Sequence, residues 1–119
     1  MFIYHNTNPY NRHIEDCVLR AISTLTNKSW EETSDELNDL ANDMGYMFSN
    51  VEFVENYLDN RYLRECHYSK TVGEFAKEHP YGKYAVTMDG HITAIINGNI
   101  LDTFNPSNRI MRCAWRIDF

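Results

Sequence analysis

The chain has 119 residues and a mass of 14.0 kDa, close to the typical size of a single domain. Its hydrophobic fraction of 43% and aromatic fraction of 13% are enough to build a core. The net charge of −6 and the scattered Lys and Arg residues argue against nucleic-acid binding, and no segment reaches the roughly 18 apolar residues of a membrane span. We therefore predict one domain over residues 1–119 with no nucleic-acid and no membrane partner, and we leave the oligomeric state open.

The three cysteines are Cys17, Cys66 and Cys113. An odd number without paired spacing is not typical of a disulfide framework, so we expect free thiols and a cytoplasmic protein. Cys66 and Cys113 alternate with polar residues, which predicts buried structural thiols. The first residues also lack the charged and apolar regions of a signal peptide.

The first 80 residues have a helical pattern. A helix is expected over about residues 16–25, because apolar residues recur there with helical spacing and Asp16 is a suitable N-cap. Further helices are expected where Ser or Thr precedes Glu by three residues. These capping boxes pair Ser29 with Glu32, Ser49 with Glu52, and Thr71 with Glu74. A short strand is expected within residues 62–68.

After Pro80 the pattern changes to that of strands, expected over residues 84–88, 91–96, 99–104 and 110–117. The pairs Asp89-Gly90 and Asn97-Gly98 lie between the first three and are strong signals for two-residue type I′ hairpin turns. The predicted fold class is therefore α+β, with helices in about residues 1–80 packed on an antiparallel sheet formed by about residues 81–119.

Cys17 stands in the first turn of the first predicted helix, directly after a polar segment. The free N–H groups and the dipole at a helix N-terminus favour a thiolate over a thiol. Cys17 is therefore a candidate nucleophile. The alternative is that it is a small buried hydrophobic residue, as many free cysteines are.

The hairpin register supplies a candidate base. If Asn97-Gly98 is a two-residue loop, Thr93 faces Asp102 and His91 faces Phe104. His91 and Asp102 then lie on the same sheet face as diagonal neighbours, close enough for their side chains to form a hydrogen bond. A carboxylate bonded to an imidazole fixes its tautomer and stabilises the imidazolium, as in a catalytic triad. A slip of one residue would separate the two.

The order of these residues resembles that of the papain-like cysteine peptidase superfamily. Three segments, residues 16–22, 71–80 and 90–98, are similar to small papain-like proteins of phages and prophages of Gram-positive bacteria. The resemblance covers nearly the whole chain. It implies a reduced papain-like fold in which the helix that carries the nucleophile packs on a sheet that carries the base.

The resemblance assigns the roles of nucleophile to Cys17, general base and acid to His91, and orienting carboxylate to Asp102. Papain-like enzymes have a Gln about six positions before the cysteine that helps to hold the oxyanion. The matching residue here is the shorter Asn11, with Asn8 as a second candidate, and the backbone N–H of Cys17 is a further donor. Trp115 is either a shield for the His91–Asp102 hydrogen bond or an ordinary core residue.

These observations predict a cysteine peptidase or amidase that acts on a peptide, isopeptide or amide bond, with a peptide or protein as substrate. The triad does not distinguish hydrolysis from deamidation or transamidation. The alternative is a catalytically weak or inactive papain-fold binding protein, a phage-encoded factor that engages a host protein. No Cys and His residues recur at zinc-ligand spacing, so we expect neither a metal site nor a cofactor.

Overall fold

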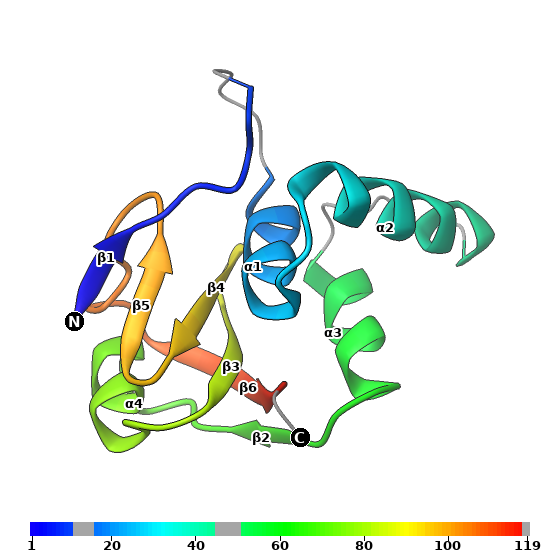
Figure 1. Cartoon of the computed structure of the whole chain (residues 1–119). Helices are drawn as coiled ribbons and strands as arrows, with labels where there is room; N and C mark the ends of the chain where they lie inside the picture. Colours follow the sequence, from blue (N-terminus) through cyan, green and yellow to red (C-terminus); the bar gives the residue numbers. More distant parts are fainter. Residues whose placement is uncertain (11–15, 45–50, 118–119) are drawn as a thin grey trace.

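The computed structural model describes residues 1–10, 16–44 and 51–117, which contain four helices and six strands. The helices are α1 (Cys17–Thr26), α2 (Trp30–Met44), α3 (Val51–Asp59) and α4 (Val72–Glu78). The strands are β1 (Phe2–Tyr4), β2 (Arg64–Cys66), β3 (Lys83–Met88), β4 (His91–Ile96), β5 (Asn99–Asp102) and β6 (Met111–Arg116). The fold is α+β, as predicted (Figure 1).

One mixed sheet organises the fold, with strand order β1-β5-β4-β3-β6-β2. The consecutive strands β3, β4 and β5 pair antiparallel through two-residue turns. Asn97 and Gly98 both have positive φ, at 50° and 78°, so their turn has the predicted type I′ character. In the Asp89-Gly90 turn only Gly90 has positive φ, at 71°, so the type I′ prediction is wrong there although the loop length is right.

The edges of the sheet differ from the prediction. β1 pairs parallel with β5, and β2 pairs antiparallel with β6, so strands from the first 80 residues extend the sheet on both sides. The short strand expected within residues 62–68 is confirmed as β2. The prediction of an antiparallel sheet formed by about residues 81–119 is wrong in leaving out both edge strands and in missing the parallel pairing of β1. A three-residue strand carries little pattern of its own, and its partner is determined by contacts with residues far away in sequence.

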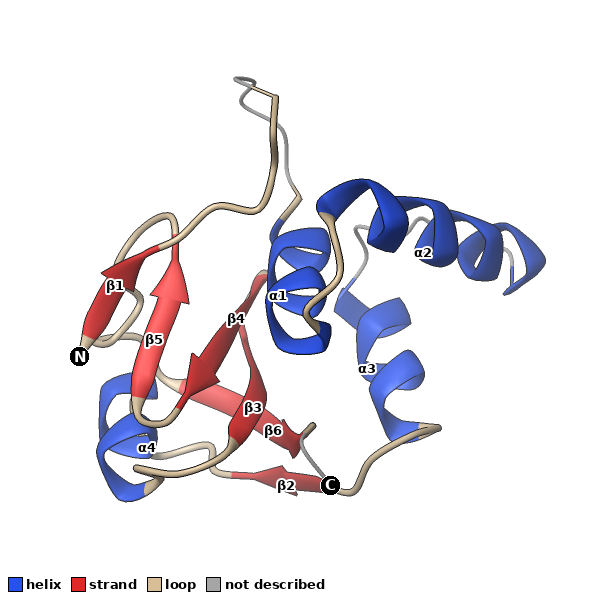
Figure 2. Ribbon diagram, in the orientation of Figure 1, coloured by secondary structure: helices blue, strands red, loops and turns tan. Residues whose placement is uncertain are grey.

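Helices cover both faces of the sheet (Figure 2). On one face α1, α2 and α3 share a core with alternate sheet residues that include Ala85, Ile92 and Ala94. On the other face α4 packs on Val86, Ile95 and their neighbours. The alternation of side chains along a strand explains this division, because adjacent residues of β4 point to opposite faces.

Two of the three predicted capping boxes lie within the described residues, and the structure confirms one of them in full and the other in its Ser29 bond. Thr71 and Glu74 form the complete capping box that begins α4, and the Ser29 hydroxyl accepts the Glu32 N–H at the start of α2. The box that begins with Ser49 lies outside the described residues. Asn27 has a left-handed conformation with φ of 56° and ends α1.

Candidate active site

Cys17 is the first residue of α1 and its side chain is a free, half-buried thiol. The predicted apolar stripe that follows it, which includes Val18, Ile22 and Leu25, is fully buried in the core shared with the sheet. This packing anchors the helix through its body. The N-terminal end, where the thiol stands, is thereby held in a defined place at the end of the sheet.

The hairpin brings the predicted base and orienting carboxylate together. Ile96 pairs with Asn99 and Ala94 with Leu101, which is the predicted register. His91 Nε2 lies 2.8 Å from Asp102 Oδ2, and both residues are buried, with exposed fractions of 6% and 5%. The predicted hydrogen bond between His91 and Asp102 is therefore confirmed.

Cys17 interacts with the same imidazole, since its side chain contributes to the pKa of His91. His91 is the first residue of β4, and Cys17 is the first residue of α1. The imidazole thus interacts both with a buried carboxylate and with a free thiol.

The charges of this group reinforce one another. Burial lowers the pKa of His91, but the hydrogen bonds with Asp102 and Cys17 outweigh it and raise the pKa from 6.5 to about 9. Burial raises the pKa of Asp102, but the His91 bond and the nearby Thr93 hydroxyl hold it below its ordinary value. Thr93 Oγ1 is buried and makes no hydrogen bond of standard geometry within the described residues. At neutral pH the arrangement favours the imidazolium form of His91.

The aromatic ring over the imidazole is Phe104, not Trp115. The His91 and Phe104 ring centroids lie 4.7 Å apart at 45°. Trp115 is completely buried in the core and donates from Nε1 to Asp59 Oδ1 at 2.9 Å, which makes it the ordinary core residue of the two alternatives. Phe104 could have been found from the sequence, because the hairpin register already placed it opposite His91.

Asp16 does not cap α1 as predicted. It occupies the N-cap position, but its side chain makes no capping bond. Its buried carboxylate instead binds Arg20 in an ion pair and accepts hydrogen bonds from Asn8 Nδ2 at 3.0 Å and Trp30 Nε1 at 2.9 Å. Three donors from separate segments outcompete the helix N–H groups for this carboxylate.

The oxyanion donor is only partly defined. Asn11, the first candidate, lies outside the described residues. Asn8, the second, has its amide engaged: Nδ2 donates to Asp16 and Oδ1 accepts the Tyr10 N–H at 2.8 Å. Since Asp16 leaves the start of α1 uncapped by its side chain, the backbone N–H of Cys17 remains a candidate donor.

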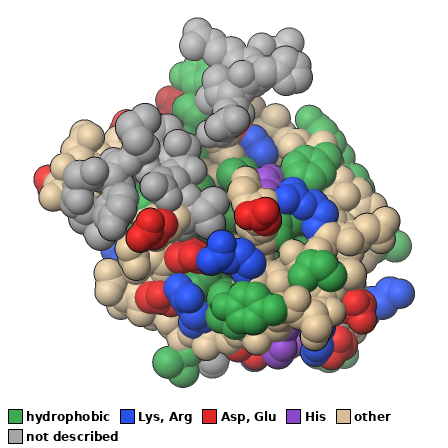
Figure 3. Space-filling view, turned by 180° about the vertical axis from the view of Figure 1, so that it is seen from behind, with side chains coloured by type: hydrophobic (Ala, Val, Ile, Leu, Met, Phe, Trp, Pro, Cys, Tyr) green, Lys and Arg blue, Asp and Glu red, His purple; other side chains and the backbone are tan. Residues whose placement is uncertain are grey.

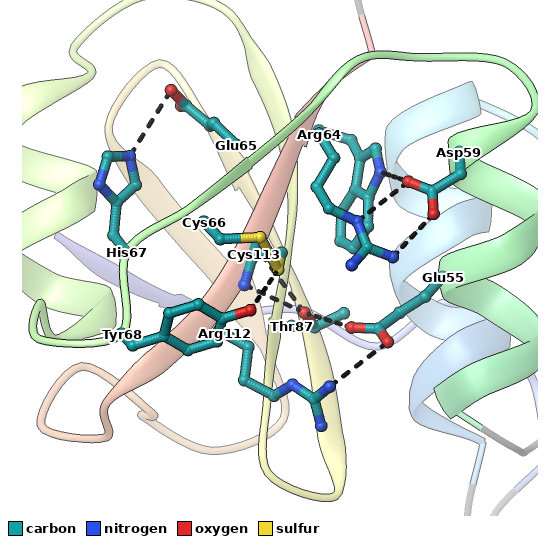
Figure 4. The surroundings of a disulfide bond; sticks show 11 residues. Glu55, Asp59, Arg64, Glu65, Cys66, His67, Tyr68, Thr87, Arg112 and Cys113 are labelled. Atoms are coloured by element: carbon teal, nitrogen blue, oxygen red, sulfur yellow. Dashed lines mark hydrogen bonds and ion pairs between the residues drawn. A yellow bond between two sulfur atoms is a disulfide. The ribbon is translucent and has the colours of Figure 1, made fainter.

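The other two cysteines form a disulfide, which corrects the prediction of free structural thiols. Cys66 on β2 and Cys113 on β6 are directly paired residues of adjacent antiparallel strands, with Cα atoms 4.0 Å apart (Figure 4). Their separation of 47 residues hid this pairing in the sequence. The cysteine count therefore no longer supports a reducing compartment.

A cavity of about 280 Å³ lies elsewhere, lined by Leu63, Arg64, Glu65, His79, Tyr84 and Arg116. It shares no residue with Cys17, His91 and Asp102.

Polar, charged and aromatic side chains mix on the face of the molecule opposite the view of Figure 1 (Figure 3). Among the described residues no three His, Cys, Asp or Glu side chains form a metal-binding group. None of the described helices is both long and apolar enough to span a bilayer.

The chain was compared with models of known protein families, with curated proteins and with solved structures, and none of the three comparisons found a match. The geometry of the site and the resemblance of the sequence to papain-like proteins are therefore the two grounds for inferring a function.

Proposed function

We propose that this chain is a thiol-dependent acyl-transfer enzyme with a reduced papain-like fold: a cysteine peptidase or amidase acting on a peptide, isopeptide or amide bond. The observation that carries the proposal is the buried 2.8 Å bond between His91 Nε2 and Asp102 Oδ2, formed beside the free thiol of Cys17. A structural histidine needs only one partner. This one is bonded to a carboxylate and also interacts with a free thiol.

In the proposed reaction the Cys17 thiolate attacks the carbonyl carbon and forms a tetrahedral oxyanion. The His91 imidazolium then gives its proton to the leaving amine, the C–N bond breaks, and an acyl-enzyme with a neutral imidazole remains. A water molecule loses its proton to His91 and attacks the acyl carbon. The carboxylic acid leaves, and the thiolate–imidazolium pair is restored. Transfer to an amine instead of water gives transamidation from the same intermediate.

The remaining residues support this sequence of steps. Asp102 keeps the imidazole in one orientation and stabilises its charged form. Phe104 covers the ring, which limits competition from water for the bond to Asp102. The Cys17 backbone N–H and the Asn11 amide are the proposed oxyanion donors.

Alkylation of Cys17 by iodoacetamide tests the proposal without knowledge of the substrate. We expect labelling well below pH 8 in the native protein and a loss of about a hundredfold in rate at pH 6.5 for His91→Ala, because the imidazolium favours the reactive thiolate. His79→Ala is the matched control, since His79 contacts Phe75 and Tyr84 instead and its loss should leave the rate unchanged.

The same measurement separates the enzyme from the alternative. If Cys17 in the folded protein reacts no faster than an exposed model thiol, and His91→Ala has no effect, the enzyme proposal fails. The papain-fold binding protein that engages a host protein is then the better account. A rate of substrate turnover that has a bell-shaped pH profile and is abolished by alkylation of the protein would support the enzyme proposal.

Action in the cytoplasm of a phage-infected or lysogenic bacterium is a further part of this proposal, and it has its own test. In protein whose free thiols are alkylated at lysis, mass spectrometry should find three alkylated cysteines if the cytoplasm keeps Cys66 and Cys113 reduced, and one if their disulfide forms in the cell.

A further inference from the structure

A buried carboxylate stands directly before the proposed nucleophile. Asp16 is only 2% exposed and receives donors from three parts of the chain: Asn8 of the N-terminal segment, Arg20 of α1 and Trp30 of α2. Its own side chain does not cap the helix. Its position next to Cys17 therefore needs another explanation.

A lone negative charge beside Cys17 would oppose the chemistry, because it repels a thiolate in a medium of low dielectric. Arg20 provides the compensating charge. It lies three residues after Cys17, a spacing that places two side chains on neighbouring positions of one helix face. Its guanidinium forms the ion pair with Asp16 while only 16% of its side chain is exposed.

Arg20 also interacts with the other side of the site. Burial lowers the pKa of Arg20, and the electrostatic interactions with Asp102 on β5 and with Tyr4 on β1 act in the opposite direction. Arg20 is therefore within electrostatic range of both carboxylates that flank the Cys17–His91 pair. The Arg20 Nε is buried and has no hydrogen-bond partner within the described residues. The Arg20 side chain is therefore held in place by its ion pair with Asp16.

We infer that Arg20 is a positioning residue of the thiol site, which cancels the buried charge of Asp16 beside Cys17 so that the thiolate forms next to a neutral pair. This inference rests on the proposed function. The charged groups that face the site are Asp16 and Arg20 of α1, His91 of β4 and Asp102 of β5, with Tyr4 of β1 as the nearest phenol. Trp30, the contribution of α2, is uncharged.

The inference predicts opposite effects for the two members of the pair. Arg20→Gln leaves the Asp16 carboxylate uncompensated, so Cys17 alkylation at pH 6.5 should slow by on the order of tenfold and its pH profile should move to higher pH. Asp16→Asn leaves Arg20 uncompensated, so alkylation should be faster and its profile should move to lower pH. A residue with a merely structural role would impair the site in both variants.

Two alkylating agents of similar size distinguish local charge from disorder. Iodoacetate carries a negative charge and iodoacetamide is neutral. The rate with iodoacetate divided by the rate with iodoacetamide should fall in Arg20→Gln and rise in Asp16→Asn. In the double variant Asp16→Asn/Arg20→Gln this ratio should return to within about twofold of its native value. Lys28→Gln is the matched control: it removes the same charge from the exposed ion pair with Glu36 and should leave the ratio unchanged.

The outcomes separate this inference from the proposed function. Slow alkylation of Cys17 in the native protein, independent of His91, overturns both. Fast, His91-dependent alkylation with an unchanged rate ratio in Asp16→Asn overturns the role of Arg20 alone, and so does a ratio in the double variant that stays as high as in Asp16→Asn. These two variants decide the question even if Arg20→Gln fails to fold, because neither leaves a buried carboxylate without a partner.

Discussion

Two neighbouring parts of the sheet hold similar groups that are used in different ways: β4 and β5, here called the Cys17 end of the strand order, and β3, β6 and β2, here called the disulfide end. At one end Asp102 is buried beside Thr93, His91 and the free Cys17. At the other end Glu55 is also buried, and it accepts a hydrogen bond from Thr87 at 3.2 Å next to the disulfide of Cys113 (Figure 4). Each end thus combines a buried carboxylate, a threonine hydroxyl and sulfur.

The two ends differ in the basic residue that pairs with the buried carboxylate. The partner of Glu55 is Arg112, 3.6 Å away, which stays charged at any ordinary pH, and the sulfur is already bonded. The partner of Asp102 is a histidine, which can release and accept a proton, and the sulfur is free. We therefore expect the disulfide end to stabilise the fold and the Cys17 end to transfer protons, and substitutions at the two ends should have different effects.

The largest difference should come from removal of each carboxylate partner. His91→Ala should reduce the alkylation rate of Cys17 at pH 6.5 by about a hundredfold, whereas Arg112→Ala should change it by less than about twofold, because Arg112 forms its ion pair with Glu55 at the disulfide end. Rates are measured by mass spectrometry after timed exposure to iodoacetamide. Equal effects of the two substitutions would contradict the division of roles.

Removal of the disulfide should have a large effect on stability and little on reactivity. The bond links residues 47 apart, a loop that includes β3, β4 and β5. The double variant Cys66→Ala/Cys113→Ala should lose about 2–4 kcal/mol of unfolding free energy, because the unfolded chain gains freedom. Urea unfolding measures the loss. Cys17 alkylation in the folded variant should be unchanged, and a slower rate there would show that the two ends are coupled.

Alkaline pH should weaken the Cys17 end specifically. The folded pKa of His91, about 9, lies above its ordinary value of 6.5, so protonated His91 stabilises the fold fully below about pH 6.5 and this contribution is lost as pH rises through 9. At about 1.4 kcal/mol per pKa unit the loss is at most roughly 3 kcal/mol, reduced by solvent screening. Urea unfolding at pH 6 and 9.5 should show the decrease in native protein and a smaller one in His91→Gln.

Acid pH should remove the stabilising contribution of the Asp102 carboxylate. Because the pKa of Asp102 is held below its ordinary value of 3.8, its contribution is present above that pH and is lost as pH falls through the folded value. Unfolding of Asp102→Asn should therefore depend less on pH in the acid range than unfolding of the native protein.

The smallest expected effects are at the two threonine hydroxyls. Thr87 Oγ1 donates to Glu55 and accepts the Cys113 N–H at 3.3 Å, all buried. Thr87→Val keeps the shape but leaves both partners without this bond, which should cost about 1–3 kcal/mol of unfolding free energy. Thr93→Val at the other end should cost less, because Thr93 Oγ1 makes no such bond within the described residues.

The sequence was informative where local chemistry determines structure. Asn97-Gly98 requires a tight turn with positive φ, and that turn sets the register that brings His91 to Asp102. The stripe behind Cys17 likewise follows from helical spacing. These features depend on neighbours within about a dozen residues, so a pattern can reveal them.

The features that the sequence did not reveal depend on partners far away in the chain. Asp16 occupies the N-cap position, yet its carboxylate accepts hydrogen bonds from Trp30 and Asn8, which lie outside the helix. The Cys66–Cys113 pairing and the parallel pairing of β1 with β5 join segments about 50 and 100 residues apart. No local periodicity distinguishes such contacts from their alternatives.

The proton state of His91 is the central claim, and a titration by nuclear magnetic resonance of the imidazole Cε1–H tests it most directly. In the native protein the His91 signal should titrate near pH 9, and Asp102→Asn and Cys17→Ser should each move the midpoint toward 6.5, because each removes a partner that favours the imidazolium. A midpoint at or below 6.5 in the native protein, unchanged in both variants, would contradict the account.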